Sequence, residues 1–332
     1  MTLLVTGGAG FIASNFILDW LERSSERIVN LDKLTSDWHA GILEEMGTDP
    51  RHIFVRGDIG DKLLVKELLE KYKPRAVLNF AAETHVDHSI AFPEQFVETN
   101  ILKTFYLLEI VNDYYKNLEG DAREGFRFLQ VSTDEVYGSL QKNEAAFTED
   151  HSVLPNNPYS ATKAAADHII RSYHHTYSLP VLTTHSSNNY GPHQSPEKLI
   201  PLVIKRALSE EPLPVFGDGK NIRDWIYVGD HCTALRKVLE QGKAGETYNI
   251  GGNTEKQNID LVREICAILD IEKPRPSGSY ADLIAFVTDR PGHDRRYAIN
   301  SGKMARDLSW APQTDFGEGL RKTLKWYLDR WS

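Results

Sequence analysis

A glycine-rich turn near the start of the chain constrains the fold more than any other feature. Residues 3–6 have the composition of a short buried strand, residues 7–13 contain three glycines, and residues 14–21 have helical apolar spacing. This order is typical of a dinucleotide-binding unit, because glycine lets the backbone approach a pyrophosphate and the helix N-terminus supplies amide donors. The alternative is a turn that only packs a helix against a sheet.

The acid that follows this unit favours one dinucleotide. Residues 28–32 form a second predicted strand that ends in Asp32. An acid about 20 residues beyond the glycine turn accepts a ribose hydroxyl and repels a 2′-phosphate. We therefore expect NAD rather than NADP.

Strands and helices then alternate along the first half of the chain. Further strands are predicted at 52–59, 76–82 and 126–131, and a helix is predicted at 62–73, where Pro74 stops it. The pattern predicts an α/β protein with a Rossmann-type, doubly wound parallel sheet. A helix predicted at 93–115 is apolar on more than one side. We expect one side to meet the sheet, and the other to meet a second subunit or a thick core of the same chain.

Composition excludes several classes of protein. The net charge of -9 argues against a nucleic-acid scaffold, which needs clustered Lys and Arg. Cys232 and Cys266 are far apart and lack metal-ligand spacing, so we expect neither a disulfide framework nor a metal site. The chain opens directly into a strand, and no apolar run reaches transmembrane length. These features predict a cytoplasmic protein without membrane contact.

Two polar motifs stand where a parallel sheet binds its ligand. Residues 132–138 follow the strand at 126–131 and place the acids Asp134 and Glu135 beside Thr133, which suggests a proton-handling site. A polar loop that caps a helix is the alternative. Further on, Tyr159 and Lys163 lie one helical turn apart. A nearby ammonium should lower the tyrosine pKa and make Tyr159 a base toward a sugar hydroxyl.

With these motifs, the chain resembles the extended short-chain dehydrogenase/reductases, and within them the dTDP-glucose 4,6-dehydratases. The resemblance covers essentially the whole chain, and its most specific motif is residues 132–138. Supporting motifs lie at residues 79–87, 187–192, 196–201, 217–225 and 289–294. The resemblance implies a hydro-lyase that converts a nucleotide-activated glucose to its 4-keto-6-deoxy product with bound NAD, which is regenerated in each turnover.

The resemblance also implies the catalytic roles. Tyr159 would take the proton of the C4 hydroxyl while hydride passes to NAD, with Lys163 on the ribose and Thr133 on the C4 oxygen. Glu135 would remove the C5 proton and Asp134 would protonate the departing C6 hydroxyl, before hydride returns to C6. The residues alone do not decide which acid stays protonated.

Contacts follow for both ligands, and no metal is expected. Apart from Tyr159 and Lys163, the cofactor-binding residues are expected to be Gly7, Gly10, Phe11, Ile12, Asp32, Lys33, Thr35, Asp58, Ile59, Phe80, Ala81, Ala82, Thr99 and Asn189. The substrate-binding residues implied by the resemblance are Thr84, Asn188, Lys198, Leu199, Arg223, Asn258 and His293. Ala13 and the loop at 36–40 depart from the family pattern near the cofactor.

The remaining expectations concern organisation and rival functions. We expect an NAD-binding domain from residues 1–185 and 222–250, and a smaller, discontinuous α/β nucleotide-sugar-binding lobe from 186–221 and 251–332. A homodimer is expected through the helix at 93–115 and the helix that carries Tyr159. The rival functions are a UDP-glucose 4,6-dehydratase, a nucleotide-sugar 4-epimerase, and a non-enzymatic dinucleotide-sensing or scaffold protein.

Overall fold

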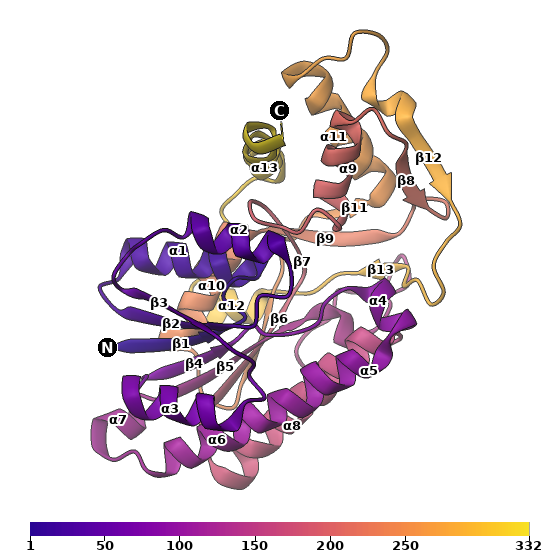
Figure 1. Ribbon diagram of the computed structural model, residues 1–332. Coiled ribbons are helices and arrows are strands. Elements are labelled where there is room, and N and C mark those ends of the chain that lie inside the picture. Colours follow the sequence, from indigo (N-terminus) through magenta and orange to yellow (C-terminus); the bar gives the residue numbers. More distant parts are fainter. Residues whose placement is uncertain (332) are drawn as a thin grey trace.

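A computed structural model describes residues 1–331, and seven parallel strands form its central sheet (Figure 1). The strand order is β10-β6-β5-β4-β1-β2-β3. The strands are β1 Thr2–Thr6, β2 Arg27–Asp32, β3 His52–Arg56, β4 Ala76–Asn79, β5 Arg127–Thr133, β6 Val181–Ser186 and β10 Thr247–Ile250. In register, Thr6 pairs with Leu31 on one side and with Asn79 on the other. The order reverses between β1 and β4, which confirms the doubly wound, Rossmann-type fold.

Helices cover both faces of this sheet (Figure 1). Helices α1, α2, α10 and α12 share one apolar core, and α3, α6 and α8 share the other. These helices are α1 Phe11–Arg23, α2 Asp37–Glu45, α3 Lys62–Tyr72, α6 Thr104–Lys116, α8 Pro158–Tyr177, α10 Val228–Gln241 and α12 Gly302–Leu308. Short helices α4 Val86–Ala91 and α7 Gly120–Glu124 flank the second group. Because both faces are covered, the inner strands β1, β4 and β6 are buried at every position instead of alternating between buried and exposed residues.

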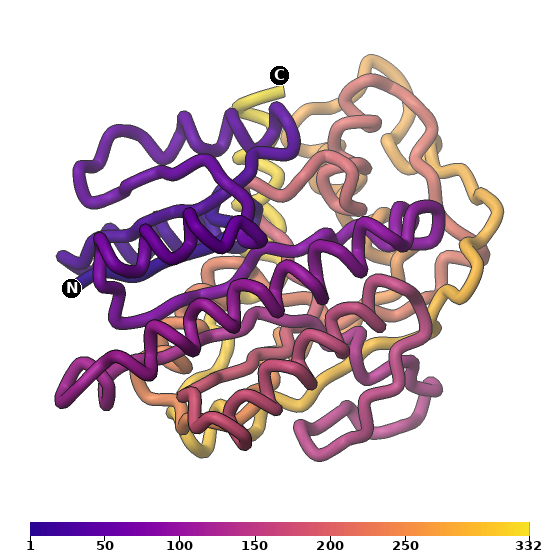
Figure 2. The backbone as a smooth tube through the Cα atoms, turned by 60° about the horizontal axis from the view of Figure 1, so that its bottom comes forward, coloured from indigo at the N-terminus to yellow at the C-terminus, as the bar shows by residue number. Residues whose placement is uncertain are grey.

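The long helix predicted at 93–115 is confirmed, with an irregular centre. It comprises α5 Pro93–Phe96, a π-helical segment Val97–Lys103 and α6. Figure 2 shows this run lying beside α8, which it contacts along its length. Its inner side is buried, whereas Phe92, Val97 and Leu102 remain exposed on the outer side.

The second lobe combines two small sheets with three helices. One sheet contains β7 Asn188–Tyr190, β9 Ile222–Tyr227, β11 Glu255–Gln257 and β13 Arg296–Tyr297, and the other pairs β8 Leu213–Phe216 with β12 Ile284–Val287. The helices are α9 Leu199–Leu208, α11 Asn258–Glu272 and α13 Phe316–Trp331, with a 3-10 turn at Tyr280–Leu283. They share a separate apolar core with β8 and β9.

The chain crosses between the lobes several times. Strand β9 belongs to the sheet of the second lobe, although the predicted division assigns residues 222–250 to the NAD-binding domain. Conversely, Met304 and Leu308 of α12 pack into the core of the first lobe. The exact domain division therefore stays a prediction. Within residues 1–331, no helix combines the length and the apolarity that a membrane crossing needs.

Candidate active site

The expected cofactor site lies where the strand order reverses, at the carboxyl ends of β1 and β4. Gly7 follows β1 with φ of 70°, a conformation that favours glycine. A Cβ atom at Gly7 would lie only 2.7 Å from the backbone nitrogen of Ala81, which follows β4. Two backbone segments thus approach each other closely at the switch point, where doubly wound sheets bind nucleotides.

The turn after β1 leaves helix α1 open at its N-terminus. Gly10 is the N-cap and provides no side-chain cap, and the first turn holds no acid. The first amides of α1 are therefore available to an anion, and the helix dipole favours one there. At the end of β2, Asp32 accepts hydrogen bonds from the amides of Ala9 (3.0 Å) and Leu34 (2.7 Å). This glycine cradle and fixed carboxylate fit a dinucleotide.

Ion pairs hold the other polar residues predicted to contact the cofactor. Asp58 accepts from the amide of Gly60 (2.8 Å) and from Lys103 (3.0 Å), and these contacts lower its pKa against the opposing effect of burial. Lys33 pairs with Glu83 at 3.0 Å. Each group is only partly buried, so it is held at the edge of the cleft rather than sealed inside.

The remaining residues predicted to bind the cofactor differ in burial and in their hydrogen bonds within the protein. Phe80, Ala81 and Ala82 are half-buried directly after β4, while Ile59 and Thr99 are buried. The hydroxyl of Thr35 lies 3.1 Å from His39. The side chain of Asn189 forms hydrogen bonds within the protein. Its Nδ2 donates to the carbonyl of Ser187 (3.0 Å), and its Oδ1 accepts from Nδ1 of His231 (2.8 Å).

The acid pair sits on a 3-10 turn, Asp134–Tyr137, at the end of β5. Thr133 caps this turn by accepting the amide of Glu135 at 3.3 Å. Asp134 is 2% exposed, and its Oδ2 has no hydrogen-bond partner within residues 1–331. Burial, Glu135 and then Asp224 raise the pKa of Asp134 well above its usual value. These effects favour the protonated form of Asp134.

Glu135 has charged neighbours that differ in part from those of Asp134. Burial raises its pKa, but Arg223, Lys198 and a hydrogen bond from Asn157 all oppose this rise. Arg223 lowers the pKa of Asp134 as well, but there Glu135 and Asp224 act in the opposite direction. The two acids thus lie in different electrostatic surroundings, as a proton donor and a base would need.

Tyr159 and Lys163 face the acid pair from the start of α8. Asn157 forms a capping box with Ser160, and Pro158 occupies the first turn. Tyr159 is 8% exposed and Lys163 4% exposed. The Lys163 ammonium donates to the carbonyl of Val131 at 2.9 Å.

The expected lowering of the Tyr159 pKa by Lys163 is wrong for this arrangement. Burial and the charge of Glu135 raise the Tyr159 pKa, and burial also lowers the Lys163 pKa. Proximity along one helix face is outweighed by desolvation of both groups. Tyr159 therefore has to hand its proton on, or be helped by a bound ligand, in order to act as a base.

The second lobe brings two cations to the same place. Arg223 is 8% exposed, donates to the carbonyl of Asp294 (3.0 Å), and lies 4.2 Å above the centre of the Tyr297 ring. Lys198, half-buried just before α9, donates to the carbonyl of Thr84 (2.9 Å) in the first lobe. The cleft between the lobes can thus receive an anionic ligand.

The other residues predicted to bind substrate are less uniform. The side-chain oxygens of Asn188 and Asn258 are buried, and neither has a partner within the described chain. Both remain available as acceptors for ligand hydroxyls. His293 Nδ1 lies 2.6 Å from Asp289, and Leu199 is half-buried at the start of α9. Thr84 is exposed and contributes its carbonyl to Lys198.

Two functional neighbours were not predicted. Asn157 reaches Glu135 while capping α8, and the Asn-Pro pair before the predicted helix signals only the cap. Asp224, beside Arg223, is 1% exposed and accepts from the amides of Gly252 (3.0 Å) and Thr254 (2.6 Å). It acts on Asp134 across the lobes, and no local pattern marks that contact.

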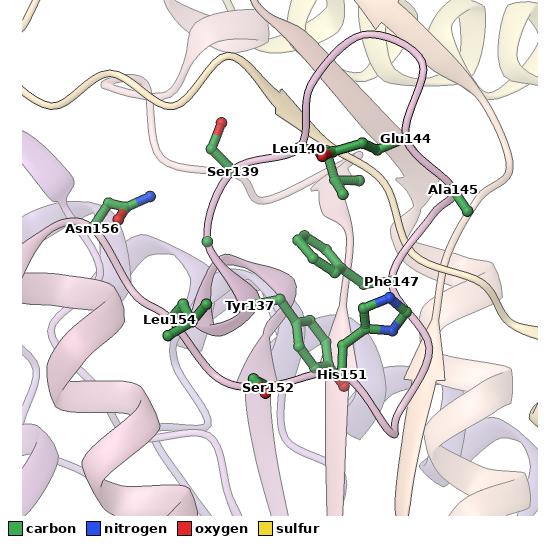
Figure 3. A pocket seen from close by; sticks show the side chains of 11 residues that line it. Tyr137, Ser139, Leu140, Glu144, Ala145, Phe147, His151, Ser152, Leu154 and Asn156 are labelled. Carbon is green, nitrogen blue, oxygen red and sulfur yellow. The ribbon is translucent and has the colours of Figure 1, made fainter.

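A cavity of about 610 Å³ lies next to this site, against the end of the acid-bearing turn. Figure 3 shows Tyr137, Phe147 and His151 lining it together with the loop around Leu154. Asp134, Glu135 and Tyr159 do not line it. Within residues 1–331, no three His, Cys, Asp or Glu side chains gather as a metal would require.

Comparison with known proteins gives a consistent result. The GDP-mannose 4,6 dehydratase family matches residues 4–323. A dTDP-glucose 4,6-dehydratase of Xanthomonas campestris pv. campestris (strain B100) is 56% identical over 328 residues, which cover 98% of this chain and 93% of the relative.

Two solved structures with the same fold have different named activities. A dTDP-glucose 4,6-dehydratase from Bacillus anthracis, in complex with NAD, has a TM-score of 0.87 and 43% identity, covering 99% of this chain and 97% of that one. A UDP-glucuronic acid 4-epimerase from Bacillus cereus, with UDP-glucuronic acid and NAD, also reaches 0.87, with 99% of both chains covered, but is only 26% identical. The fold is thus common to both activities, and sequence identity distinguishes them.

Proposed function

The chain belongs to the family of dTDP-glucose 4,6-dehydratases, and from this we propose how its cleft converts dTDP-glucose to dTDP-4-keto-6-deoxyglucose. The reaction oxidises C4, eliminates water across C5 and C6, and reduces C6. The observation that carries the proposal is the acid pair Asp134 and Glu135 on the turn that follows β5, close to Tyr159 and to the cations Arg223 and Lys198.

NAD is the cofactor, and the cradle at the switch point fits it. The uncapped start of α1 would hold the pyrophosphate, and Asp32 would hold the adenosine ribose. The close approach of Gly7 to Ala81 leaves no room for a side chain between cofactor and sheet. When bound, NAD would supply the acceptor for the hydride of C4 and, in its reduced form, the source of the hydride for C6.

Tyr159 takes the proton of the C4 hydroxyl, and Lys163 orients the ribose beside it. Because burial favours the neutral phenol, Tyr159 has to lose its own proton to solvent before the sugar fills the site. The positive charges of Lys163 and of the bound nicotinamide would then stabilise the phenolate that accepts the C4 hydroxyl proton. Thr133, which lies close enough to oppose the rise in the Tyr159 pKa, is placed to hydrogen-bond the same oxygen. A ketone at C4 then acidifies the C5 proton.

The acid pair carries out the elimination. Glu135, whose carboxylate is favoured by Arg223 and Lys198, removes the C5 proton. Asp134, held protonated by burial and by its neighbouring acids, gives its proton to the departing C6 hydroxyl. The C5–H and C6–O bonds break, a C5–C6 double bond forms, and water leaves. When hydride then adds to C6, Glu135 returns its proton to C5. Arg223 and Lys198 also attract the diphosphate.

Purified protein tests this proposal without added cofactor. Incubation with dTDP-glucose should yield a product that develops near-UV absorbance in alkali, as 4-keto-6-deoxy sugars do. UDP-glucose, measured side by side, should turn over much more slowly. Equal turnover of the two sugars would contradict the nucleotide preference, and release of a C4 epimer instead of a ketone would identify an epimerase.

We propose further that the protein is a cytoplasmic homodimer. Both cysteines are buried and free, as is usual in a reducing compartment. Ile90, Phe92, Val97 and Leu102, on α4 and the run that follows it, expose apolar side chains next to α8. Exposed apolar residues gathered in this way typically mark a contact between proteins.

A further inference from the structure

A buried polar network connects the helix that carries the base to the turn that carries the acid pair. It begins at Asp167, one helical turn beyond Lys163 on α8, whose side chain is 13% exposed. Its Oδ2 accepts from the hydroxyl of Ser132 (2.6 Å) and from Nε2 of His185 (3.2 Å). The carboxylate is therefore fixed from β5 and β6 at once.

The network continues from His185 to the acid-bearing turn. His185 Nδ1 lies 2.8 Å from the hydroxyl of Tyr137, the last residue of that turn. The Tyr137 hydroxyl also donates to Asn249 of β10 at 2.9 Å. Tyr137 and His185 pack edge to face with ring centres 5.0 Å apart, and both are at most 5% exposed. Buried polar chains of this kind fix the elements that they join.

We propose that Asp167 is a positioning residue for the reaction: it keeps Lys163 charged and, through His185 and Tyr137, fixes the turn that bears Asp134 and Glu135. In this proposal Asp167, His185 and Tyr137 act through their neighbours and do not touch the reacting atoms. The inference rests on the proposed function, since it assigns Asp167 to the residues of that reaction.

The position and the charge of Asp167 support the part of the proposal that concerns Lys163. Lys163 is buried and donates to the carbonyl of Val131, while Asp167, one helical turn further along α8, accepts from Ser132, the next residue of β5. The ammonium and the carboxylate therefore lie on the same side of α8 against the same strand. Asp167 is the group that opposes the loss of the Lys163 proton, and it acts on the pKa of Tyr159 in the same direction. The titratable groups that α8, the acid-bearing turn and β6 present toward Asp167 are Lys163, Tyr159, Tyr137 and His185. Glu149 stands beyond Asn249 at the far end of the network.

The pH profile of kcat/KM for dTDP-glucose tests this part. Asp167→Asn keeps the shape of the side chain and removes its charge, which lowers the pKa values of Lys163 and Tyr159. The basic limb of the profile, where Lys163 loses its proton, should move to lower pH by about one unit, while the acidic limb, set by Glu135, should stay in place. The matched control is Asp113→Asn, because Asp113 likewise has a lysine close to it on the same helix, Lys116 at 3.1 Å, but is exposed. Its profile should coincide with that of the unchanged protein.

A purely structural Asp167 would lower the height of the profile without moving it, and that result would overturn the proposal. Failure of the unchanged protein to turn over dTDP-glucose would instead refute the proposed function. The two failures are therefore distinguishable.

Tyr137→Phe tests the second part and does not depend on the folding of Asp167→Asn. It removes one hydroxyl and thereby the link between His185 and the acid-bearing turn. Elimination should slow about tenfold while C4 oxidation persists, so the absorbance of reduced cofactor on the enzyme should rise during turnover. Tyr114→Phe is the control, because it also loses a single hydrogen bond, to the carbonyl of Pro74 (3.2 Å), away from the cleft. Equal behaviour of the two variants would show that the link does not position the acids.

Discussion

Replacing Gly7 by alanine tests whether close backbone approach builds the cofactor site. Two costs are expected. The φ of 70° is unfavourable for alanine by about 1–2 kcal/mol. In addition, the new Cβ atom would lie 2.7 Å from the nitrogen and 2.8 Å from the Cα of Ala81. Because both atoms are backbone, the strand end has to move, which adds about 1–3 kcal/mol.

Gly47→Ala isolates the first of these costs. Gly47 has φ of 68°, and nothing lies within 4 Å of the position that its Cβ atom would take. At about 2 °C per kcal/mol for a chain of this size, Gly7→Ala should unfold about 2–6 °C below Gly47→Ala. Added NAD should raise the unfolding temperature of Gly47→Ala and of the unchanged protein, but not that of Gly7→Ala.

Thermal unfolding with and without NAD gives the difference in unfolding temperature between the variants and the rise that NAD causes in each. The amount of cofactor that co-purifies with each variant is a third measurement. Equal unfolding temperatures for Gly7→Ala and Gly47→Ala, with equal response to NAD, would refute the reasoning. The approach of Gly7 to Ala81 would then not determine how the cofactor site is built.

Four further predictions concern catalysis, pH and assembly. Glu135→Gln should lower product formation by about 10²–10⁴-fold while reduced cofactor accumulates in stopped-flow absorbance, and near-normal product would exclude Glu135 as the base. Arg223→Gln removes a cation that lowers the Glu135 pKa, so the acidic limb of kcat should move to higher pH; an unmoved limb would contradict this. Burial lowers the pKa of His231 from 6.5 to about 3, so its contribution to stability is lost as pH falls below 6.5, by about 2 kcal/mol at pH 5; denaturant unfolding should show a smaller loss for His231→Asn than for the exposed control His175→Asn. Phe92→Glu, at 61% exposure, should convert the dimer to a monomer in light scattering, and a dimer that persists would place the interface elsewhere.

The sequence predicts the first lobe well because its signals are local. The glycine turn, the acid at the end of β2 and the stop at Pro74 each act within a few residues, and each stands where predicted. Strand β9 is different. Its apolar residues suit either sheet, and only its pairing with β7, β11 and β13 decides which sheet it joins. Such pairing is non-local, so no pattern within residues 222–227 could specify it.

The loop at 36–40 shows the same limit. Its departure from the family pattern marked it as unusual, but nothing in it predicts the outcome. Ser36 caps α2, and Trp38 packs against Trp326 and Trp331 of α13 while its Nε1 donates to the carbonyl of His193 (3.0 Å). The expected loop at 36–40 is therefore wrong, since residues 37–40 form the first turn of α2. The partners of Trp38 lie more than 150 residues away, and they make the start of this helix a contact with the second lobe.

The chemistry of the acid pair depends on the same kind of long-range contact. Asp134 and Glu135 are neighbours on one turn, and burial alone would raise the pKa of both. Charges of the second lobe then act on them unequally. Arg223 lowers the pKa of both acids, Lys198 also lowers that of Glu135, and Asp224 raises that of Asp134. Arg223 and Asp224 are successive residues of β9, so one strand of the second lobe supplies both a cation and an anion to the pair. Two carboxyl groups that are neighbours in the first lobe thus come to differ because of residues that lie far away in the sequence.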